Sequence, residues 1–88
     1  MKQFEIAHRT EAPAAFTIEH DGQEDAGILT YYIKNDTLLI THVGVVGSLR
    51  GTGAARQLVD RAVEYAREFH LEIQSFCSYG SHILNTCY

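Results

Sequence analysis

The stretch HVGVVGSLRGTGAARQLVDRAVEYAREF, residues 42–69, joins an apolar run to an amphipathic segment through a short turn that contains Gly51 and Gly53. After Thr52 the hydrophobic period changes, and apolar side chains recur at spacings of three and four, which is the stripe of an amphipathic helix. The residues of this stripe are Ala55, Leu58, Val59, Ala62, Val63, Ala66 and Phe69. The stretch therefore predicts a strand, a glycine turn and a long helix.

The start of this helix has the parts of an anion site. The first N–H groups of a helix have no partner inside it, and the helix dipole adds about half a positive charge there. Without side chains at Gly51 and Gly53 an anion can approach the backbone, and Arg50 supplies a mobile cation. The Gly-Lys-Ser/Thr of a Walker loop and the third glycine of the dinucleotide fingerprint are both missing. The pattern predicts a phosphate or pyrophosphate cradle, with a simple glycine turn as the alternative.

Four segments upstream read as strands. The first two alternate apolar and polar residues, and the other two are rich in β-branched, aromatic and aliphatic residues; they are residues 3–8, 15–20, 28–34 and 38–46. Residues 21–27 are read as a loop, and residues 35–37 as a turn. Gly44, inside the fourth segment, suggests a bulge or a close backbone approach.

The C-terminal part completes the predicted fold. Residues 71–76 predict a fifth strand, and residues 78–88 a short last helix. A strand, a helix and another strand imply parallel pairing with a right-handed crossover. The expected fold is α+β in the order β-β-β-β-α-β-α, an antiparallel meander followed by a parallel β-α-β unit, in one domain over residues 1–88.

Composition narrows the classes of function. The formal net charge of −4 argues against non-specific nucleic-acid binding, which needs a basic surface. No apolar run is long enough to span a membrane, and the N-terminal residues lack the apolar region of a signal peptide. We therefore expect a cytoplasmic protein with no nucleic-acid or membrane partner, in which Cys77 and Cys87 are reduced thiols.

Residues 50–55, Arg-Gly-Thr-Gly-Ala-Ala, match the pattern Arg/Gln-x-x-Gly-x-Gly/Ala. This loop resembles the acyl-CoA pyrophosphate loop of the GNAT superfamily of acetyltransferases. Together with HVGV before it and LVDRAVEYAREFHLEIQSFCSY after it, the chain resembles very short, single-domain GNAT-like proteins over residues 26–84. Val43, Gly47 and Ala54 stand where that pattern more often has Thr, Pro and a larger aliphatic residue, and none of these changes removes a backbone donor.

The resemblance implies an acetyl-CoA-dependent N-acetyltransferase whose acceptor is an amine on a small molecule or a protein. It also implies that the fourth and fifth strands splay apart, so that the pantetheine arm of coenzyme A lies against Val43, Gly44 and Val45. The residues expected to hold the pyrophosphate are Arg50, Gly51, Thr52, Gly53, Ala54 and Ala55. The alternative function is a non-catalytic module that binds CoA or acyl-CoA. A homodimer is a further expectation.

Two residues are candidates for the chemistry. Cys77 precedes the predicted last helix, where a thiol has a lowered pKa and is a better nucleophile. The similar short proteins have a cysteine here that would take the acetyl group or assist its transfer, and a buried inert cysteine is the alternative. His42 matches the family's histidine before the splay and would act as a base near neutral pH, with a merely structural strand histidine as the alternative.

The remaining histidines and the two neighbouring tyrosines are read as structural or surface residues. No Cys-x-x-Cys or His-x-x-x-His pair is present, so no metal site is expected. His8, His20 and His70 are read as surface or cap positions, and His82 as solvent-facing. Tyr31 and Tyr32 are expected to pack on the sheet.

Overall fold

The computed structural model describes the backbone of residues 3–87 and the side chains of residues 3–86. The elements are β1 (Ile6–Arg9), β2 (Ala14–His20), β3 (Gln23–Lys34), β4 (Thr37–Val45), a 3₁₀ turn (Gly47–Leu49), α1 (Ala54–Glu68), β5 (Glu72–Ser75) and α2 (Ser78–Cys87). This is the predicted order of strands and helices, so the expected α+β fold class is confirmed.

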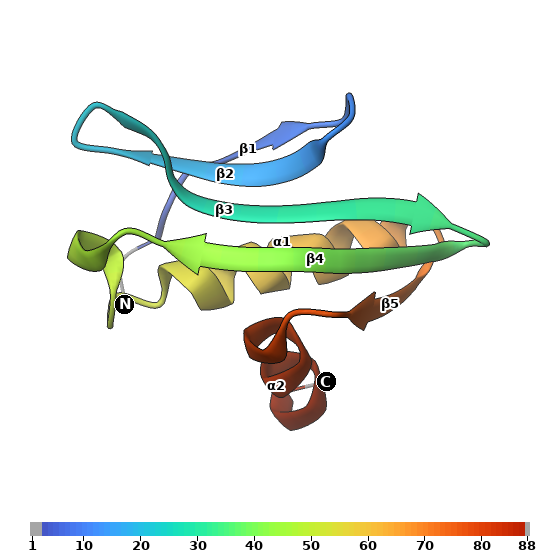
Figure 1. Ribbon diagram of the computed structural model, residues 1–88. Coiled ribbons are helices and arrows are strands. Elements are labelled where there is room, and N and C mark those ends of the chain that lie inside the picture. The colour runs from blue at the N-terminus through green and yellow to red at the C-terminus, as the bar shows by residue number, and fades with distance from the viewer. Residues whose placement is uncertain (1–2, 88) are drawn as a thin grey trace.

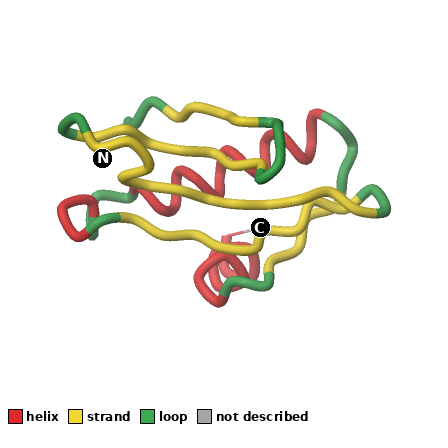
Figure 2. The backbone as a smooth tube through the Cα atoms, turned by 45° about the horizontal axis from the view of Figure 1, so that its top comes forward, coloured by secondary structure: helices red, strands yellow, loops and turns green. Residues whose placement is uncertain are grey.

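The five strands form one mixed sheet in the order β1-β2-β3-β4-β5. The first four strands are antiparallel neighbours, and β5 pairs parallel to β4, as the strand–helix–strand pattern predicted. Helix α1 runs across one face of the sheet, while α2 lies at the edge beyond β5 (Figures 1 and 2). No helix within residues 3–87 is long and apolar enough to cross a membrane.

The core lies between α1 and the sheet face that it covers. The predicted helical stripe supplies Leu58, Val59 and Ala62, whose side chains are fully buried. They belong to one cluster with Phe16 and Leu29 of the sheet, which are also fully buried. Burial of each of the Leu, Val and Phe side chains stabilises the fold by about 1.5–3 kcal/mol relative to leaving it in water. The helical period therefore fixes which face of α1 meets the sheet. Phe69, the last residue of the predicted stripe, is an exception: α1 ends at Glu68, and the Phe69 side chain is 54% exposed.

Both long hairpins turn on two residues. Asp21 and Gly22 have φ of 51° and 75°, and Asn35 and Asp36 have φ of 52° and 59°. Two successive positive φ values match the twist of antiparallel strands, and Asp-Gly is a preferred sequence for such a turn. The predicted loop at residues 21–27 is therefore wrong, because β3 begins at Gln23 directly after the turn. Polarity misled the prediction, since the first three residues of β3 have exposed side chains, whereas Ala26 is already buried.

The bulge expected near Gly44 lies earlier in β4. Thr30 pairs with His42, whereas Tyr31 pairs with Ile40, so Thr41 is the extra residue. Gly44 keeps a regular partner in β3, and its missing side chain serves a close approach instead. A Cβ atom built on Gly44 would lie 2.9 Å from Nε2 of His42. The glycine thus lets the His42 ring lie against the strand.

His8 is not the surface residue that the sequence suggested. Its ring stacks on Phe16 with centroids 4.1 Å apart, and its Nε2 shares a hydrogen bond of 2.5 Å with the hydroxyl of Tyr31. Tyr65 of α1 meets the same ring edge-on at 4.6 Å. Burial, and then the nearby charge of Arg61, lower the pKa of His8 below 6.5. Alternation along a short strand could not show this, because the partners come from three other elements.

Candidate functional site

Strands β4 and β5 separate halfway along β4. Their pairing runs from Thr37 opposite Glu72 to Ile40 opposite Ser75, and the N–H of Phe76 then donates to the carbonyl of Ile40 over 2.8 Å. Beyond that point β5 ends and the chain turns into α2 (Figure 1). Within residues 3–87, the second half of β4 therefore has β3 on one side and no strand on the other. This is the splay that the resemblance implied.

A groove of about 490 Å³ opens beside this free edge. It is lined by Val43, Gly44, Val45, Leu49, Arg50, Gly51, Gly53, Ala54, Ala55 and Tyr79. Of the residues predicted to hold a cofactor, every one except Thr52 lies on its wall. The strand end, the glycine loop and the first turn of α1 thus form one continuous surface. In the sequence, the only sign of this surface was that the three segments follow one another.

Leu49 and Tyr79 are the lining residues that the sequence reading missed. Leu49 is 2% exposed and directly precedes the loop. In the sequence, its position next to Arg50 was the one hint that it lies at the site. Tyr79 comes from α2, and no sequence pattern shows that this helix faces the groove. Its contribution follows from the β5–α2 connection, which carries the helix back towards β4.

The loop before α1 has the backbone geometry of an anion cradle. Gly51 and Gly53 have φ of 76° and 86°, a left-handed conformation that strains any residue with a side chain. Such alternation of backbone conformation directs successive N–H groups to one side and forms a concave anion site. No described residue accepts a hydrogen bond from the N–H groups of Gly51, Gly53 or Ala55. Three donors are thus available at the start of a helix.

Thr52 braces the loop from behind. Its hydroxyl donates to the carbonyl of Leu49 over 2.5 Å and accepts the N–H of Ala54 over 3.3 Å. Its own N–H also donates to Leu49, over 3.3 Å. The hydroxyl and the N–H of Thr52 and the N–H of Ala54 are therefore engaged inside the loop. Thr52 shapes the cradle from outside the groove, whereas the sequence reading had placed it among the direct contacts.

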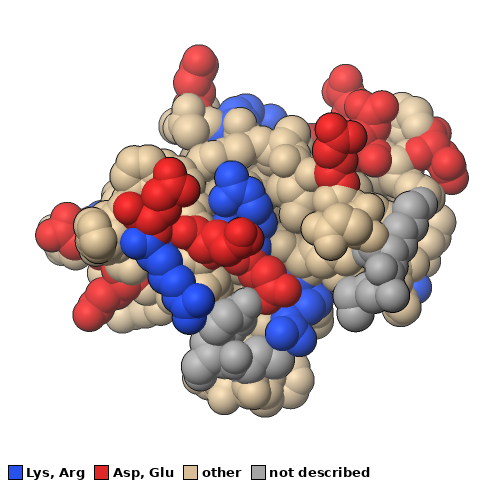
Figure 3. Space-filling view, turned by 180° about the vertical axis from the view of Figure 1, so that it is seen from behind, with Lys and Arg blue, Asp and Glu red and all other residues tan. Residues whose placement is uncertain are grey.

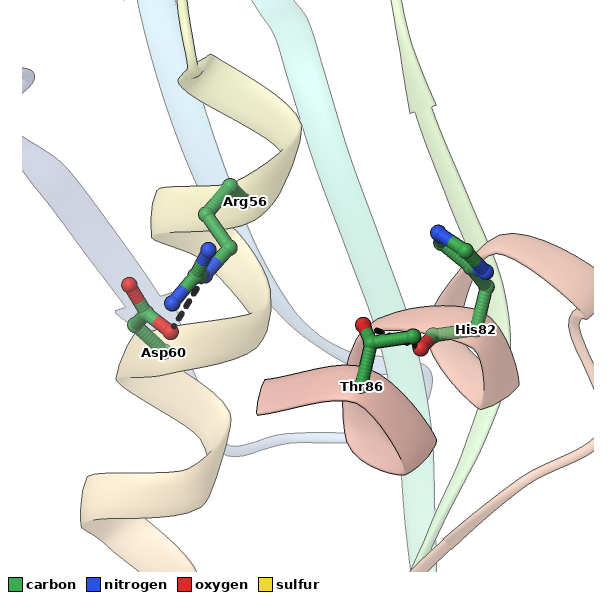
Figure 4. A network of polar contacts seen from close by, with 4 residues as sticks. All are labelled: Arg56, Asp60, His82 and Thr86. Carbon is green, nitrogen blue, oxygen red and sulfur yellow. Dashed lines mark hydrogen bonds and ion pairs between the residues drawn. The ribbon is translucent and has the colours of Figure 1, made fainter. Parts of the chain in front are cut away.

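The electrostatics of the groove favour an anion. Arg50 is exposed, and among the described residues that line the groove it is the only one with a charged side chain. On the next turn Arg56 is occupied by Asp60, with Nε and Oδ1 3.1 Å apart on the outer side of α1 (Figure 4). Over the face seen in Figure 3 basic and acidic side chains are interleaved without a continuous basic patch. The positive potential of the groove is thus local, from one guanidinium and a helix start.

Cys77 lies at the junction between β5 and α2. Its carbonyl accepts the N–H of Ser81 over 2.9 Å, so it stands in the N-cap position of α2, as the sequence predicted. The thiol is free and half-buried, and it packs against the hydrophobic core. It is absent from the groove wall, although Tyr79, two residues later, belongs to it. The side chain of Cys87 lies outside the described residues.

His42 lies on β4 next to the groove. It is exposed, and its ring covers Gly44, whose backbone lines the groove. His82 is exposed on α2 and points away from the Arg56–Asp60 pair (Figure 4). Among the residues that the structure describes, no three His, Cys, Asp or Glu side chains come together as metal ligands. The site thus joins an anion cradle to one exposed imidazole.

Comparison with known proteins agrees with this geometry. A sequence model of the family "GCN5-related N-acetyl-transferase" matches residues 15–86. The solution structure of a "GCN5-like putative N-acetyltransferase" from Staphylococcus aureus is 32% identical and superposes with a TM-score of 0.72, over 97% of this chain and 81% of that one. A search of curated protein sequences finds no match.

Proposed function

Because the chain belongs to the GCN5-related N-acetyltransferase family, we propose that it transfers the acetyl group of acetyl-CoA to an amine. Acyl transfer follows from the family, whereas the donor and the class of acceptor are our proposal. The observation that carries it is the groove in which the free edge of β4 and the anion cradle are continuous.

The cradle fits the diphosphate of coenzyme A. The free N–H groups of Gly51, Gly53 and Ala55 would bind its oxygens, and Arg50 would neutralise part of its charge. Hydrogen bonds to a charged group each contribute about 1.5–3 kcal/mol. The left-handed glycines fit as well, because their backbone can approach the phosphates without a Cβ between them. A groove of about 490 Å³ has the volume of an ordinary small-molecule site.

The free edge of β4 suits the pantetheine arm. From Thr41 to Val45 this edge has no strand partner in β5, so its backbone groups can pair with the amides of the arm. The bound donor would supply an activated acyl thioester. An N–H group of the β4 edge would then stabilise the negative charge that develops on the thioester oxygen during attack by the amine.

His42 is the residue that would move the proton. An amine attacks only after losing a proton, and an imidazole is a suitable acceptor near neutral pH. In the overall step the nitrogen of the neutral amine would bond to the acyl carbon and give up its second proton to solvent, and the carbon–sulfur bond would break so that the sulfur leaves as a thiolate. The proton taken up by His42 is then available, through solvent, to that thiolate.

A second candidate function is binding of CoA or acyl-CoA without turnover. One observation favours it: the Cys77 thiol packs against the core and is absent from the groove wall. In this alternative the chain would sense or carry the donor, and Cys77 would be an inert cap residue. Only the enzyme hypothesis allows Cys77 to form a covalent acetyl intermediate, and this can be tested directly.

The decisive experiment combines intact mass with turnover. The protein is incubated with acetyl-CoA and a panel of lysine peptides, polyamines and small aromatic amines, and release of free thiol is followed. We expect turnover with at least one amine and its loss in His42→Ala, with CoA affinity retained. An acetyl adduct that vanishes in Cys77→Ser would assign a covalent step to Cys77. Binding without thiol release across the panel would overturn the enzyme in favour of the module.

A further inference from the structure

A second hollow, of about 540 Å³, lies beside the β1–β2 connection and the start of β2. We call it the aromatic notch. Its lining residues are Thr10, Ala12, Pro13, Ala14, Thr30, Tyr31, Tyr32, Ile33, Thr41 and Tyr65. Nothing in the sequence pattern pointed to it, because its walls come from four separate elements and one loop.

The walls of the notch are aromatic and carry no formal charge. Its lining residues include three tyrosines, of which Tyr32 is 44% exposed and Tyr31 only 5%, together with Ala, Pro and Ile residues and three threonines. Burial, the neighbouring Tyr65 and the hydrogen bond to it raise the pKa of Tyr31 to about 12, so its phenol stays protonated at neutral pH. An uncharged, aromatic wall accepts an apolar ligand body and attracts a cationic head through the ring faces.

The notch also exposes part of a strand edge. Pairing of β2 with β3 ends at Ala14 opposite Tyr31, so β3 continues through Tyr32 and Ile33 without a partner in β2. These two side chains are 44% and 46% exposed, which is high for residues of their size within a strand. Backbone carbonyls along an unpaired strand edge are acceptors for the N–H groups of an amine.

The notch reaches the strand that would hold the donor. Thr41, in its wall, is the first residue of β4 beyond the pairing with β5. Its hydroxyl is 2.7 Å from that of Thr30, which ties it to the β3 side of the notch. Val43 lines the groove two residues further along, a separation of about 6–7 Å in a strand. A ligand in the notch would therefore lie near the start of the free edge.

A third hollow of about 560 Å³ offers the opposite chemistry. Four carboxylates line it, those of Glu5, Glu19, Glu24 and Asp25. It would suit a polycation, but its lining residues belong to β1, β2, β3 and the segment before β1, and none belongs to β4. It therefore does not touch the strand beside which the acyl group would lie.

We propose that the aromatic notch is the acceptor subsite, and that the acceptors are primary amines carried on an aromatic or apolar body. This inference rests on the proposed function. The apolar body is held by burial against the tyrosines, at about 25 cal/mol per Å² of apolar surface. The ammonium group faces the threonine hydroxyls and the strand edge, from which the neutral amine attacks.

The test compares two amines and two kinds of variant. The probes are 2-phenylethylamine and spermidine, and kcat/KM is measured for each with acetyl-CoA. Tyr32→Ala removes an exposed ring of the notch, and Ala12→Phe fills it from the exposed connection. The control variant is Glu19→Gln with Glu24→Gln, in the acidic hollow. We expect 2-phenylethylamine to be preferred by about tenfold or more, which is the scale of discrimination by an apolar pocket.

Both notch variants should lower kcat/KM for 2-phenylethylamine, mainly through a higher KM, and should keep the CoA affinity of the wild type. The control variant should keep the wild-type kcat/KM for 2-phenylethylamine. Preference for spermidine, or indifference of 2-phenylethylamine turnover to both notch variants, would overturn the subsite and leave the acetyltransferase intact. NMR titration without donor separates the two proposals. Shifts of notch resonances with 2-phenylethylamine, in the absence of any turnover, would support the subsite while the proposed reaction fails.

Discussion

Gly44 shows how one missing atom can place a functional side chain. Because a Cβ there would lie 2.9 Å from Nε2 of His42, Gly44→Ala must displace the imidazole or tilt the strand. We expect the variant to lower kcat about tenfold or more, the usual loss when general-base catalysis is impaired. The His42 ring resonances should shift in the free protein. Gly47→Ala is the matched control, since a Cβ there meets nothing within 4 Å. A wild-type kcat in Gly44→Ala, or an equal fall in both variants, would contradict the assignment.

His8 makes the stability depend on pH. Burial, and then Arg61, lower its pKa in the folded state below the unfolded value of 6.5. Between these two pKa values the unfolded chain binds more protons, so the free energy of unfolding falls as the pH decreases below 6.5. Urea unfolding at pH 7.5 and 5.5 should show this loss, and His8→Phe, which keeps the ring stack, should show a smaller one. The exposed His82→Gln should retain the full loss; equal losses in all three proteins would contradict the role of His8.

At the scale of elements, the β5–α2 junction depends on Gly80. The hydroxyl of Ser75 donates to the carbonyl of Cys77 over 2.9 Å and accepts its N–H over 3.0 Å, and Ser81 donates to the carbonyl of Ser75 over 3.0 Å. A Cβ at Gly80 would collide with the Ser75 hydroxyl and lie 3.1 Å from Ser75 Cβ. These contacts fix where α2 begins and hence where Cys77 and Tyr79 lie.

Gly80→Ala should therefore destabilise the protein by about 1–3 kcal/mol, the usual cost of overpacking. Intrinsic helix propensity alone predicts the opposite, a gain of about 1 kcal/mol. Chemical unfolding distinguishes the two, with the exposed Asn85→Ala on the same helix as control. A Gly80→Ala variant more stable than the wild type would show that α2 does not pack as described.

At the scale of the whole molecule, donor binding should stabilise the fold, because the groove joins β4, the loop and both helices. A ligand at 100 times its Kd adds about 2.7 kcal/mol. For a chain of 88 residues this corresponds to a Tm increase of roughly 10–20 °C. Thermal unfolding with CoA measures it, and pantetheine, which lacks the diphosphate, should give a much smaller shift.

Arg50→Ala should weaken CoA binding by roughly tenfold to a hundredfold, corresponding to about 1.5–3 kcal/mol from hydrogen bonds to a charged group. Lys34→Ala removes the same formal charge at the far end of β3 and should leave the affinity unchanged. Calorimetric titration of both variants makes the comparison. Equal weakening would mean that net charge, rather than the cradle, attracts the donor.

The sequence by itself determined the order of the elements, the buried face of α1 up to Ala66 and the position of the glycine turn before it, because these depend on neighbouring residues and on local backbone conformation. It failed at residues 21–27 and His8, where polarity hid a hairpin strand and an aromatic stack. Only the tertiary structure decided that Tyr79 faces the groove, that Thr52 braces the loop from behind and that Tyr31, Tyr65 and Thr41 meet in one notch. The reason is physical: periodicity fixes which face of an element is buried, whereas the partners on that face depend on how distant elements pack together.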